Sequence, residues 1–232
     1  MTPSAPPGGA PARFKAAIFD MDGLLIDSER HIMRAWIDGA RALGYPLAPA
    51  DFVQVIGRAA PEGNEILTRL LGSEEAFHAI LAHAHASLRG DNEHAFFPLK
   101  AGAAALLAAL AEAGVPCAVA SSSRIDEIRL RLGQVGVLDR FRALAGGDEV
   151  PRGKPDPALY LLAARRLGVA PADCIAFEDS ENGARAAQAA GIRVVIVPDL
   201  RQPPEEVAAL AHGVLESLED ALAHVPHWFP RM

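Results

Sequence analysis

Two aspartates stand two positions apart, directly behind a short apolar run. The run is FKAAIF at residues 14–19, and Asp20 and Asp22 follow it in the stretch FDMDGLLIDS. Carboxylates at the end of a buried strand lose solvation energy unless a partner compensates them. A divalent cation is such a partner, because hard cations prefer carboxylate oxygens. The pair therefore indicates either a site for chemistry or only a turn before Gly23.

Polar side chains follow three later apolar runs in the same way. These are Ser121 and Ser122 after VPCAVA, Lys154 in the loop GDEVPRGKPDP after FRALAG, and Glu178 with Asp179 after DCIAF. In open parallel sheets, ligands bind at the carboxyl ends of the strands. We therefore expect these side chains to meet Asp20 and Asp22 at one edge of a sheet.

The types of these side chains suit phosphoryl transfer. Asp20, Asp22 and Asp179 offer oxygen ligands for Mg²⁺, while a lysine, a hydroxyl and backbone N–H groups can hold a phosphate dianion. A carboxylate beside the metal can attack phosphorus to give an aspartyl-phosphate. A second carboxylate can protonate the leaving oxygen and then activate water.

The elements that must position these residues alternate between two patterns. Strand-like runs and helical patterns follow one another at residues 14–19 and from residue 98 onward, which predicts a parallel sheet covered by helices on both faces. Residues 29–97 show only helical patterns, each closed by glycine. We expect an α/β core of residues 13–28 and 97–232, an all-helical insertion at residues 29–96, and a loose tail at residues 1–12.

Composition narrows the class of protein. The 232 residues are 50% hydrophobic and 22% charged, with a net charge of −7, which argues against nucleic acid or an acidic membrane as a partner. The two cysteines lie in apolar runs and are expected to be buried thiols in a reducing compartment. The starting stretch MTPSAPPGGAPAR has no apolar core and is expected to be neither a signal peptide nor a membrane anchor. A cytoplasmic enzyme or binding protein is therefore expected, and a monomer and a homodimer are not distinguished.

Four motifs together resemble the haloacid dehalogenase superfamily, in the subgroup with a helical cap that includes β-phosphoglucomutase and phosphoglycolate phosphatase. The motifs are, in chain order, DMDGLLIDS, VASSS, GKPDP and FEDSENGARAAQAAG. The resemblance covers the chain from Arg13 to about Asp199. It implies a doubly wound, Rossmann-like parallel sheet with an inserted helical cap.

The resemblance also implies a role for each matching residue. Asp20 would be the nucleophile and a Mg²⁺ ligand, and Asp22 the general acid and base that binds the metal through its backbone carbonyl. Asp179 would be a further metal ligand, with Glu178 as a ligand or a supporting partner. The phosphate would be held by the remaining motif residues, Ser121, Ser122 and Lys154.

Within the family, the residues favour hydrolysis of a small phosphorylated metabolite, such as a sugar phosphate or phosphoglycolate. Asp22 is acidic where the dehalogenase branch has an aromatic residue, and residues 29–97 lack the lysine that the phosphonate-cleaving branch needs. A phosphosugar mutase remains an alternative, although Ile32 stands where that branch has a histidine. A non-catalytic protein that binds a phosphorylated ligand is a more distant alternative.

Some residues near the motifs carry further expectations. Arg58, in a loop of the helical insertion, is hypothesised to contact the leaving group of the substrate. Ser28 is the expected N-cap of the first inserted helix, and Asp27 is expected to support the loop or cap that helix. Ser123 is expected to cap the helix that follows the second strand.

Overall fold

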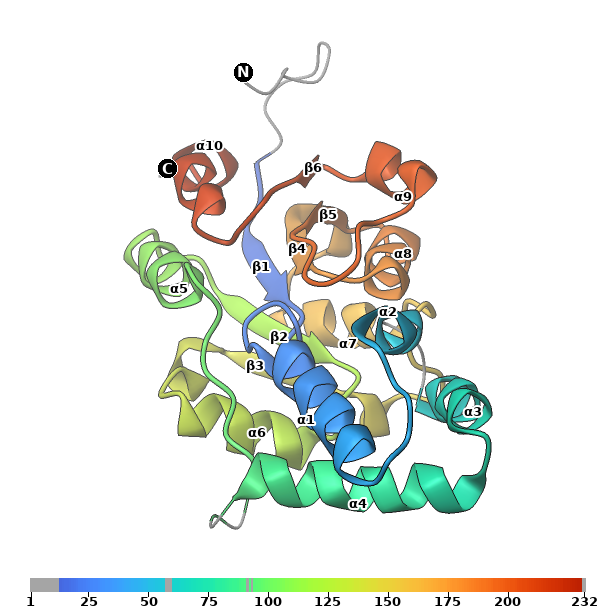
Figure 1. Ribbon diagram of the computed structural model, residues 1–232. Helices are drawn as coiled ribbons and strands as arrows, with labels where there is room; N and C mark the ends of the chain where they lie inside the picture. The colour runs from blue at the N-terminus through green and yellow to red at the C-terminus, as the bar shows by residue number, and fades with distance from the viewer. Residues whose placement is uncertain (1–12, 57–59, 91, 93, 231–232) are drawn as a thin grey trace.

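The fold alternates strands and helices around one sheet (Figure 1). A computed structural model describes residues 13–56, 60–90, 92 and 94–230. The strands are β1 (Ala16–Phe19), β2 (Cys117–Ser121), β3 (Ala143–Gly146), β4 (Cys174–Glu178), β5 (Arg193–Ile196) and β6 (Gly213–Val214). The helices are α1 (Ser28–Ala42), α2 (Pro49–Phe52), α3 (Ala60–Leu71), α4 (Glu74–Arg89), α5 (Ala103–Glu112), α6 (Ile125–Gln134), α7 (Ala158–Leu167), α8 (Glu181–Ala189), α9 (Glu205–Leu210) and α10 (Val225–Trp228).

The strands form one parallel sheet in the order β3-β2-β1-β4-β5-β6. Strand β1 lies in the middle, where Phe19 pairs with Val119 of β2 and with Phe177 of β4. The predicted parallel α/β sheet is confirmed. The sequence predicted five strands, because β6 has only two residues and shows no periodicity that could reveal it.

Side chains alternate between the two faces of the sheet, as they must along extended strands. On β1, Ala17 and Phe19 point to one hydrophobic cluster, while Ala16 and Ile18 point to the other. Helices α5, α6 and α10 cover the first face, and α7, α8 and α9 cover the second. Because β1 is buried on both faces and ends at Phe19, its position fixes where Asp20 leaves the core.

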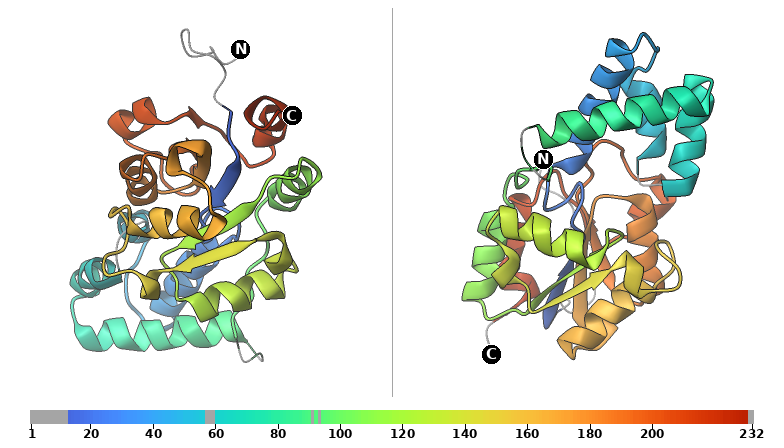
Figure 2. Two further views of the ribbon diagram at one scale, coloured as in Figure 1. Left: turned by 180° about the vertical axis from the view of Figure 1, so that it is seen from behind. Right: turned by 90° about the horizontal axis from the view of Figure 1, so that it is seen from below.

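Helices α1 to α4 follow β1 and form a separate hydrophobic cluster around Trp36, Phe77 and Ile80. The view from below in Figure 2 shows these helices gathered at one end of the molecule, beyond the sheet. No strand interrupts them in the part of this segment that the structure describes. The chain is thus an α/β fold with inserted helices. Its division at residues 28, 29, 96 and 97 remains our proposal.

Two chain segments connect these helices to the sheet, and they run side by side. The N–H of Asp27 donates to the carbonyl of Pro98 at 2.9 Å, and the N–H of Lys100 donates to the carbonyl of Leu25 at 2.8 Å. Ile26 and Leu99 form an antiparallel bridge between them. The inserted helices therefore leave the core and return to it at one place.

None of the described helices is both long enough and apolar enough to cross a bilayer.

An ion pair joins α7 to the turn after β3 and gives a testable pH dependence. Both carboxylate oxygens of Glu149 accept hydrogen bonds from Arg166 at 2.8 Å, and the N–H of Gly146 donates to Glu149 at 2.9 Å. The hydrogen bonds from Arg166 lower the pKa of Glu149 from 4.5 to about 2. Because the folded-state pKa lies below the unfolded value, the stabilisation is complete above pH 4.5 and is lost as the pH falls towards 2.

We expect Glu149→Gln to lower the free energy of unfolding at pH 7 by about 1 kcal/mol, since solvent screens this exposed pair. The difference from the wild type should vanish at about pH 2, as measured by urea denaturation at both pH values. Glu206→Gln is the matched control, because Glu206 also pairs with an arginine but its side chain is 67% exposed. An equal loss at both pH values would contradict the electrostatic explanation.

Candidate active site

The four sequence motifs meet at the carboxyl edge of the sheet, as expected. Asp20 directly follows β1, Ser121 ends β2, and Glu178 ends β4. Lys154 arrives from the loop between β3 and α7, and its Nζ donates to Asp20 Oδ1 at 2.6 Å and also to Glu178 Oε1. Asp20 and Lys154, which are 134 positions apart in the sequence, are thus in direct contact.

Lys154 is the centre of a buried polar network. Its side chain is only 7% exposed, and it contacts two carboxylates that are themselves buried. The hydroxyl of Tyr160, from α7, donates to Glu178 at 2.8 Å. Burial works to lower the pKa of Lys154, but the charges of Asp20 and Glu178 outweigh it and raise that pKa. The ammonium therefore remains charged and can compensate two anions.

The oxygens of Glu178 are already occupied by donors. Oε1 accepts from Lys154 and Tyr160, and Oε2 accepts from the N–H groups of Asp179 and Ser180 and from the Ser180 hydroxyl, at 3.0 to 3.1 Å. A carboxylate offers about four lone-pair positions, so little capacity is left for another partner. The geometry therefore favours a supporting role for Glu178 over direct metal binding. The sequence had left both roles open.

The first turn of α8 packs closely on this carboxylate. A Cβ atom at Gly183 would lie 1.8 Å from Glu178 Oε1, so only glycine fits there. The Ser180 hydroxyl, which donates to Glu178, also accepts from the N–H of Gly183 at 3.1 Å and caps the helix. The motif FEDSENG thus uses its serine and glycine to hold its glutamate in place.

Negative charge is crowded at this edge. Burial raises the pKa of Asp20 to about 7, with Lys154 opposing the shift and Glu178 adding to it. Burial and then the charge of Glu178 raise the pKa of Asp179 well above its usual range. Each carboxyl group disfavours the ionisation of its neighbours because one lysine does not balance them. This arrangement calls for an additional positive charge.

The cluster fits a hard divalent cation. One carboxylate oxygen from each of Asp20, Glu178 and Asp179 lies within 4.8 Å of the others, and all three residues are buried. Because the Glu178 oxygens are occupied by their own donors, the oxygens of Asp20 and Asp179 are those left for a cation. The donors are all oxygens, which are the ligands that Mg²⁺ prefers. A Cβ atom at Gly23 would lie 2.3 Å from Asp179 Oδ2, so the glycine lets the Asp20–Asp22 loop approach Asp179 closely. The buried acidic cluster is therefore suited to the expected metal.

Two serines at the end of β2 lie beside Asp20, at the cavity where a phosphate is expected to bind. Ser121 is buried, and its Oγ accepts from the N–H of Ser123 at 3.1 Å. Ser122 is exposed and lines the same cavity as Asp20 and Lys154. This places both predicted serines and the lysine around one space.

Asp22 is held by two serines that were expected to have other roles. Its Oδ1 accepts from the hydroxyl of Ser28 at 2.8 Å, and its Oδ2 accepts from the hydroxyl of Ser123 at 2.9 Å. The expectation that Ser28 and Ser123 are N-caps is wrong: α1 has Asp27 at that position and α6 has Arg124, both without a side-chain cap. Both hydroxyls donate hydrogen bonds to Asp22 instead, because its carboxylate lies within hydrogen-bond distance of them.

Arg131 also contacts Asp22, and no sequence pattern indicated it. Its guanidinium donates to Asp22 Oδ1 and to Glu127. On α6 this arginine looks like an ordinary surface residue, yet its side chain is only 15% exposed. Only the tertiary structure shows that this face of α6 turns towards the loop after β1.

Glu29 is a further acidic group that sequence reasoning missed. It lies in the first turn of α1 and lines the same cavity as Asp20 and Asp179. Burial, followed by the charge of Asp199, raises the pKa of Glu29 to about 8. Its Oε2 is buried without a hydrogen-bond partner among the described residues. The one sequence feature that could have indicated it is its position directly after Asp27 and Ser28, which end the first motif.

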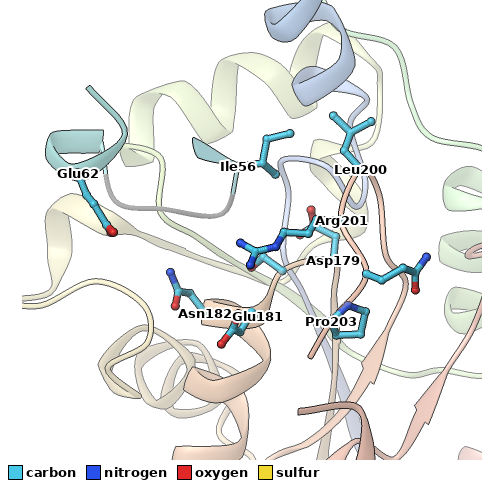
Figure 3. Close-up of a pocket in the computed structure, with 10 residues that line it drawn as sticks. Ile56, Glu62, Asp179, Glu181, Asn182, Leu200, Arg201 and Pro203 are labelled. Carbon is cyan, nitrogen blue, oxygen red and sulfur yellow. The ribbon is translucent and has the colours of Figure 1, made fainter. Parts of the chain in front are cut away.

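Two adjoining cavities surround these groups. The first, of about 570 Å³, is lined by the motif residues Asp20, Asp22, Ser121, Ser122, Lys154 and Asp179, among others. The second, of about 330 Å³, shares Asp179, Ser180 and Asn182 with the first. Figure 3 shows it between Ile56 and Leu200 on one side and the start of α8 on the other. The second cavity thus extends from the acidic cluster to the inserted helices.

Arg58, which was expected to contact the substrate, lies outside the described residues. The structure places the nearby Ile56 in the second cavity. The hypothesis for Arg58 itself remains a prediction.

Comparison with known proteins identifies relatives across the whole fold. A family model for haloacid dehalogenase-like hydrolases matches residues 14–191. Hexitol phosphatase A of Escherichia coli (strain K12) is 35% identical over 212 residues, which cover 87% of this chain and 92% of that protein. Validoxylamine A 7'-phosphate phosphatase of Streptomyces hygroscopicus subsp. limoneus is 34% identical over 187 residues, covering 77% and 83%.

A solved structure shows the same arrangement of elements. The HAD family hydrolase from Deinococcus radiodurans R1, crystallised with bound phosphate and sodium, superposes with a TM-score of 0.77 at 28% identity. The match covers 97% of this chain and all of that one. The sheet, its helices and the inserted helices are therefore shared with a solved hydrolase.

Proposed function

The chain belongs to the haloacid dehalogenase-like hydrolases, and from this membership we propose a Mg²⁺-dependent phosphatase that forms an aspartyl-phosphate on Asp20. Its activity class is that of a phosphoric monoester hydrolase. The observation that carries the proposal is the buried contact of Lys154 with both Asp20 and Glu178, beside Asp179. This contact supports the proposal because it brings the proposed nucleophile, a cation and carboxylate oxygens suited to a metal to one point.

In the first half of the proposed reaction, an oxygen of Asp20 attacks phosphorus. The new bond joins Asp20 to the phosphoryl group, the bond from phosphorus to the leaving oxygen breaks, and Asp22 gives that oxygen a proton. Lys154 and the Ser121 hydroxyl, with the exposed Ser122, hold the phosphoryl oxygens. Lys154 thereby offsets negative charge on the transferring group.

In the second half, water attacks the same phosphorus. Asp22, now a carboxylate, takes a proton from that water, and the bond from phosphorus to Asp20 breaks. Inorganic phosphate leaves and both aspartates return to their starting forms. Mg²⁺ would be held by the Asp20 and Asp179 carboxylates and by the backbone carbonyl of Asp22, and when bound it would supply positive charge to the phosphoryl oxygens.

We propose small hydroxylated phosphates, such as hexitol and sugar phosphates, as the first substrates to test. The relatives are named for phosphates of hexitols and of validoxylamine A. With the phosphate beside Asp20, the rest of the substrate would extend into the second cavity, whose lining includes Ile56, Leu200 and Gln202. That lining mixes apolar and hydrogen-bonding side chains, which suits a polyhydroxylated carbon chain.

A substrate panel tests this proposal. We expect phosphate release from sorbitol 6-phosphate, glucose 6-phosphate, 2-phosphoglycolate or p-nitrophenyl phosphate, with the highest kcat/KM on a hydroxylated alkyl phosphate. β-Glucose 1-phosphate tests the alternative, because a phosphosugar mutase would convert it to glucose 6-phosphate without releasing phosphate. Absence of turnover on the whole panel would favour a protein that only binds phosphorylated ligands.

Removal of divalent metal should reduce phosphate release by at least about 10²-fold, because crowded carboxylates would then repel the phosphate dianion. Dialysis against EDTA followed by addition of Mg²⁺ should restore the rate. Circular dichroism before and after dialysis controls for unfolding. Full activity in the metal-free protein would contradict the proposed cofactor.

A further inference from the structure

Arg131 is the strongest donor to Asp22. The other two donors, Ser28 and Ser123, are neutral hydroxyls that can rotate. Arg131 brings a positive charge and a rigid planar group, and charge-assisted hydrogen bonds are the stronger kind. Among the described residues, it is the cation that forms an ion pair with Asp22.

The guanidinium of Arg131 is itself fixed on several sides. One nitrogen donates to Asp22 and the other to Glu127, one turn earlier on α6. Its Cζ lies 5.1 Å from the centre of the Phe97 ring, which is 4% exposed. An arginine stacked on an aromatic ring and held by a second carboxylate has little freedom to move. It can therefore define where the Asp22 carboxylate points.

Asp22 lines the same cavity as Asp20 in this orientation. Ser28 begins α1, whereas Ser123 and Arg131 both lie beyond β2, at the edge of the core. Of these three donors to Asp22, Ser28 is the one that belongs to α1, so a change in the position of α1 would act on Asp22 directly through the Ser28 contact. The Asp22 carboxylate would then still be directed by Ser123 and Arg131.

We propose that Arg131 is a positioning residue that holds Asp22 in place to protonate the leaving oxygen. This inference rests on the proposed function, in which Asp22 is the general acid. The proposal predicts that the effect of Arg131 depends on the substrate, because protonation matters only where the leaving oxygen is a poor leaving group. An alkoxide needs the proton, whereas p-nitrophenolate leaves without it.

The experiment compares kcat/KM on two substrates, since kcat/KM reports only the steps up to the first irreversible one. The substrates are the best alkyl phosphate of the panel above and p-nitrophenyl phosphate. Arg131→Met keeps the packing against Phe97 and removes the charge. We expect it to lower kcat/KM on the alkyl phosphate by about 10- to 100-fold, and on p-nitrophenyl phosphate by less than about 3-fold.

Three further variants complete the design. Arg131→Lys keeps the charge but cannot donate to Asp22 and Glu127 in the same planar way, so a selective loss of about 3- to 10-fold is expected. If Arg131→Met fails to fold, this variant carries the test alone. Arg129→Met is the matched control, because Arg129 is exposed on the same helix, and it should leave both substrates unchanged. Asp22→Asn should show the full selective loss.

The possible outcomes distinguish a failure of the role proposed for Arg131 from a failure of the proposed function. A selective loss in Asp22→Asn without one in either Arg131 variant overturns the role of Arg131 and leaves the proposed function intact. An equal loss on both substrates in the Arg131 variants also overturns it, since that is the mark of a structural role. No selective loss in Asp22→Asn would overturn the general acid and, with it, this inference.

Discussion

Asp20→Asn is expected to abolish phosphate release, with a fall in kcat of at least about 10⁴-fold. The amide has nearly the shape of the carboxylate, and its oxygen can still accept the hydrogen bond from Lys154 that Asp20 accepts at 2.6 Å. It cannot attack phosphorus, because the amide lacks the nucleophilic anion. The measurement is a phosphate-release assay on the best panel substrate.

The fold of this variant should be retained. Burial raises the pKa of Asp20 to about 7, because the buried site disfavours its charged form. A neutral side chain removes that cost, and Lys154 keeps the buried Glu178 as its ion-pair partner, so the free energy of unfolding should change by no more than about 1 kcal/mol. Asp126→Asn, at an exposed position of α6, is the control. Turnover at the wild-type rate in Asp20→Asn would refute the nucleophile.

Lys154→Met is expected to damage both activity and stability. Without the ammonium, Asp20 and Glu178 would share a buried site with no cation, and breaking a buried pair in this way costs about 3–5 kcal/mol. The same change removes a positive charge from the phosphate site, so kcat/KM should fall by about 10³-fold. Urea denaturation and phosphate release measure the two effects separately.

A double variant distinguishes the two causes. Lys154→Met with Glu178→Gln removes one of the stranded charges, so it should recover much of the lost stability while activity stays lost. Lys15→Met is the matched control. Lys15 pairs with Asp173 at 2.8 Å, but its side chain is 71% exposed, so the change should cost less than about 1 kcal/mol. If Lys154→Met were as stable as the wild type, the buried network would not have the electrostatic role assigned to it.

The sequence predicted the α/β sheet and the meeting of its four motifs because both depend on local patterns. Apolar runs of strand length predict strands, and the order of strands and helices predicts a parallel sheet. Ligand-binding residues gather at the carboxyl ends of such strands, so the sequence alone could assign Asp20, Ser121, Lys154 and Glu178 to one edge of the sheet. The contacts of Lys154 with Asp20 and Glu178 agree with that reasoning.

The arrangement around Asp22 could not be predicted in the same way. Ser28 and Ser123 both precede helices, where serine is the ordinary cap, and nothing local reveals that a carboxylate lies closer. Their use depends on the path of the loop after β1, which only the tertiary structure defines. Arg131 was missed for a similar reason. The helical pattern of α6 shows which residues are apolar, but it does not show which polar residue is covered by Phe97.

The sequence also could not decide whether Glu178 binds the metal directly or only supports the residues that do. An acidic pair after a strand offers two carboxylates of equal chemistry, and only their donors distinguish them. Five donors reach Glu178, from Lys154, Tyr160 and the two residues before α8. Tyr160 lies in a helix whose sequence predicts only core packing, so its hydrogen bond to Glu178 could not be predicted.

The paired segments at Ile26 and Leu99 have a consequence for how this molecule can be altered. The segment that leaves the core and the segment that returns to it are hydrogen-bonded to each other. The two ends of the inserted helical region are therefore held side by side by the core itself. We therefore expect a segment of another length or sequence, joined at Asp27 and Pro98, to leave the register of β1 against β2 unchanged. We expect exchange at this joint to leave Asp20 and Lys154 in place. It would also replace Ser28, Glu29 and Phe97, so the new segment would have to restore the contacts that these residues make with Asp22, the cavity and Arg131.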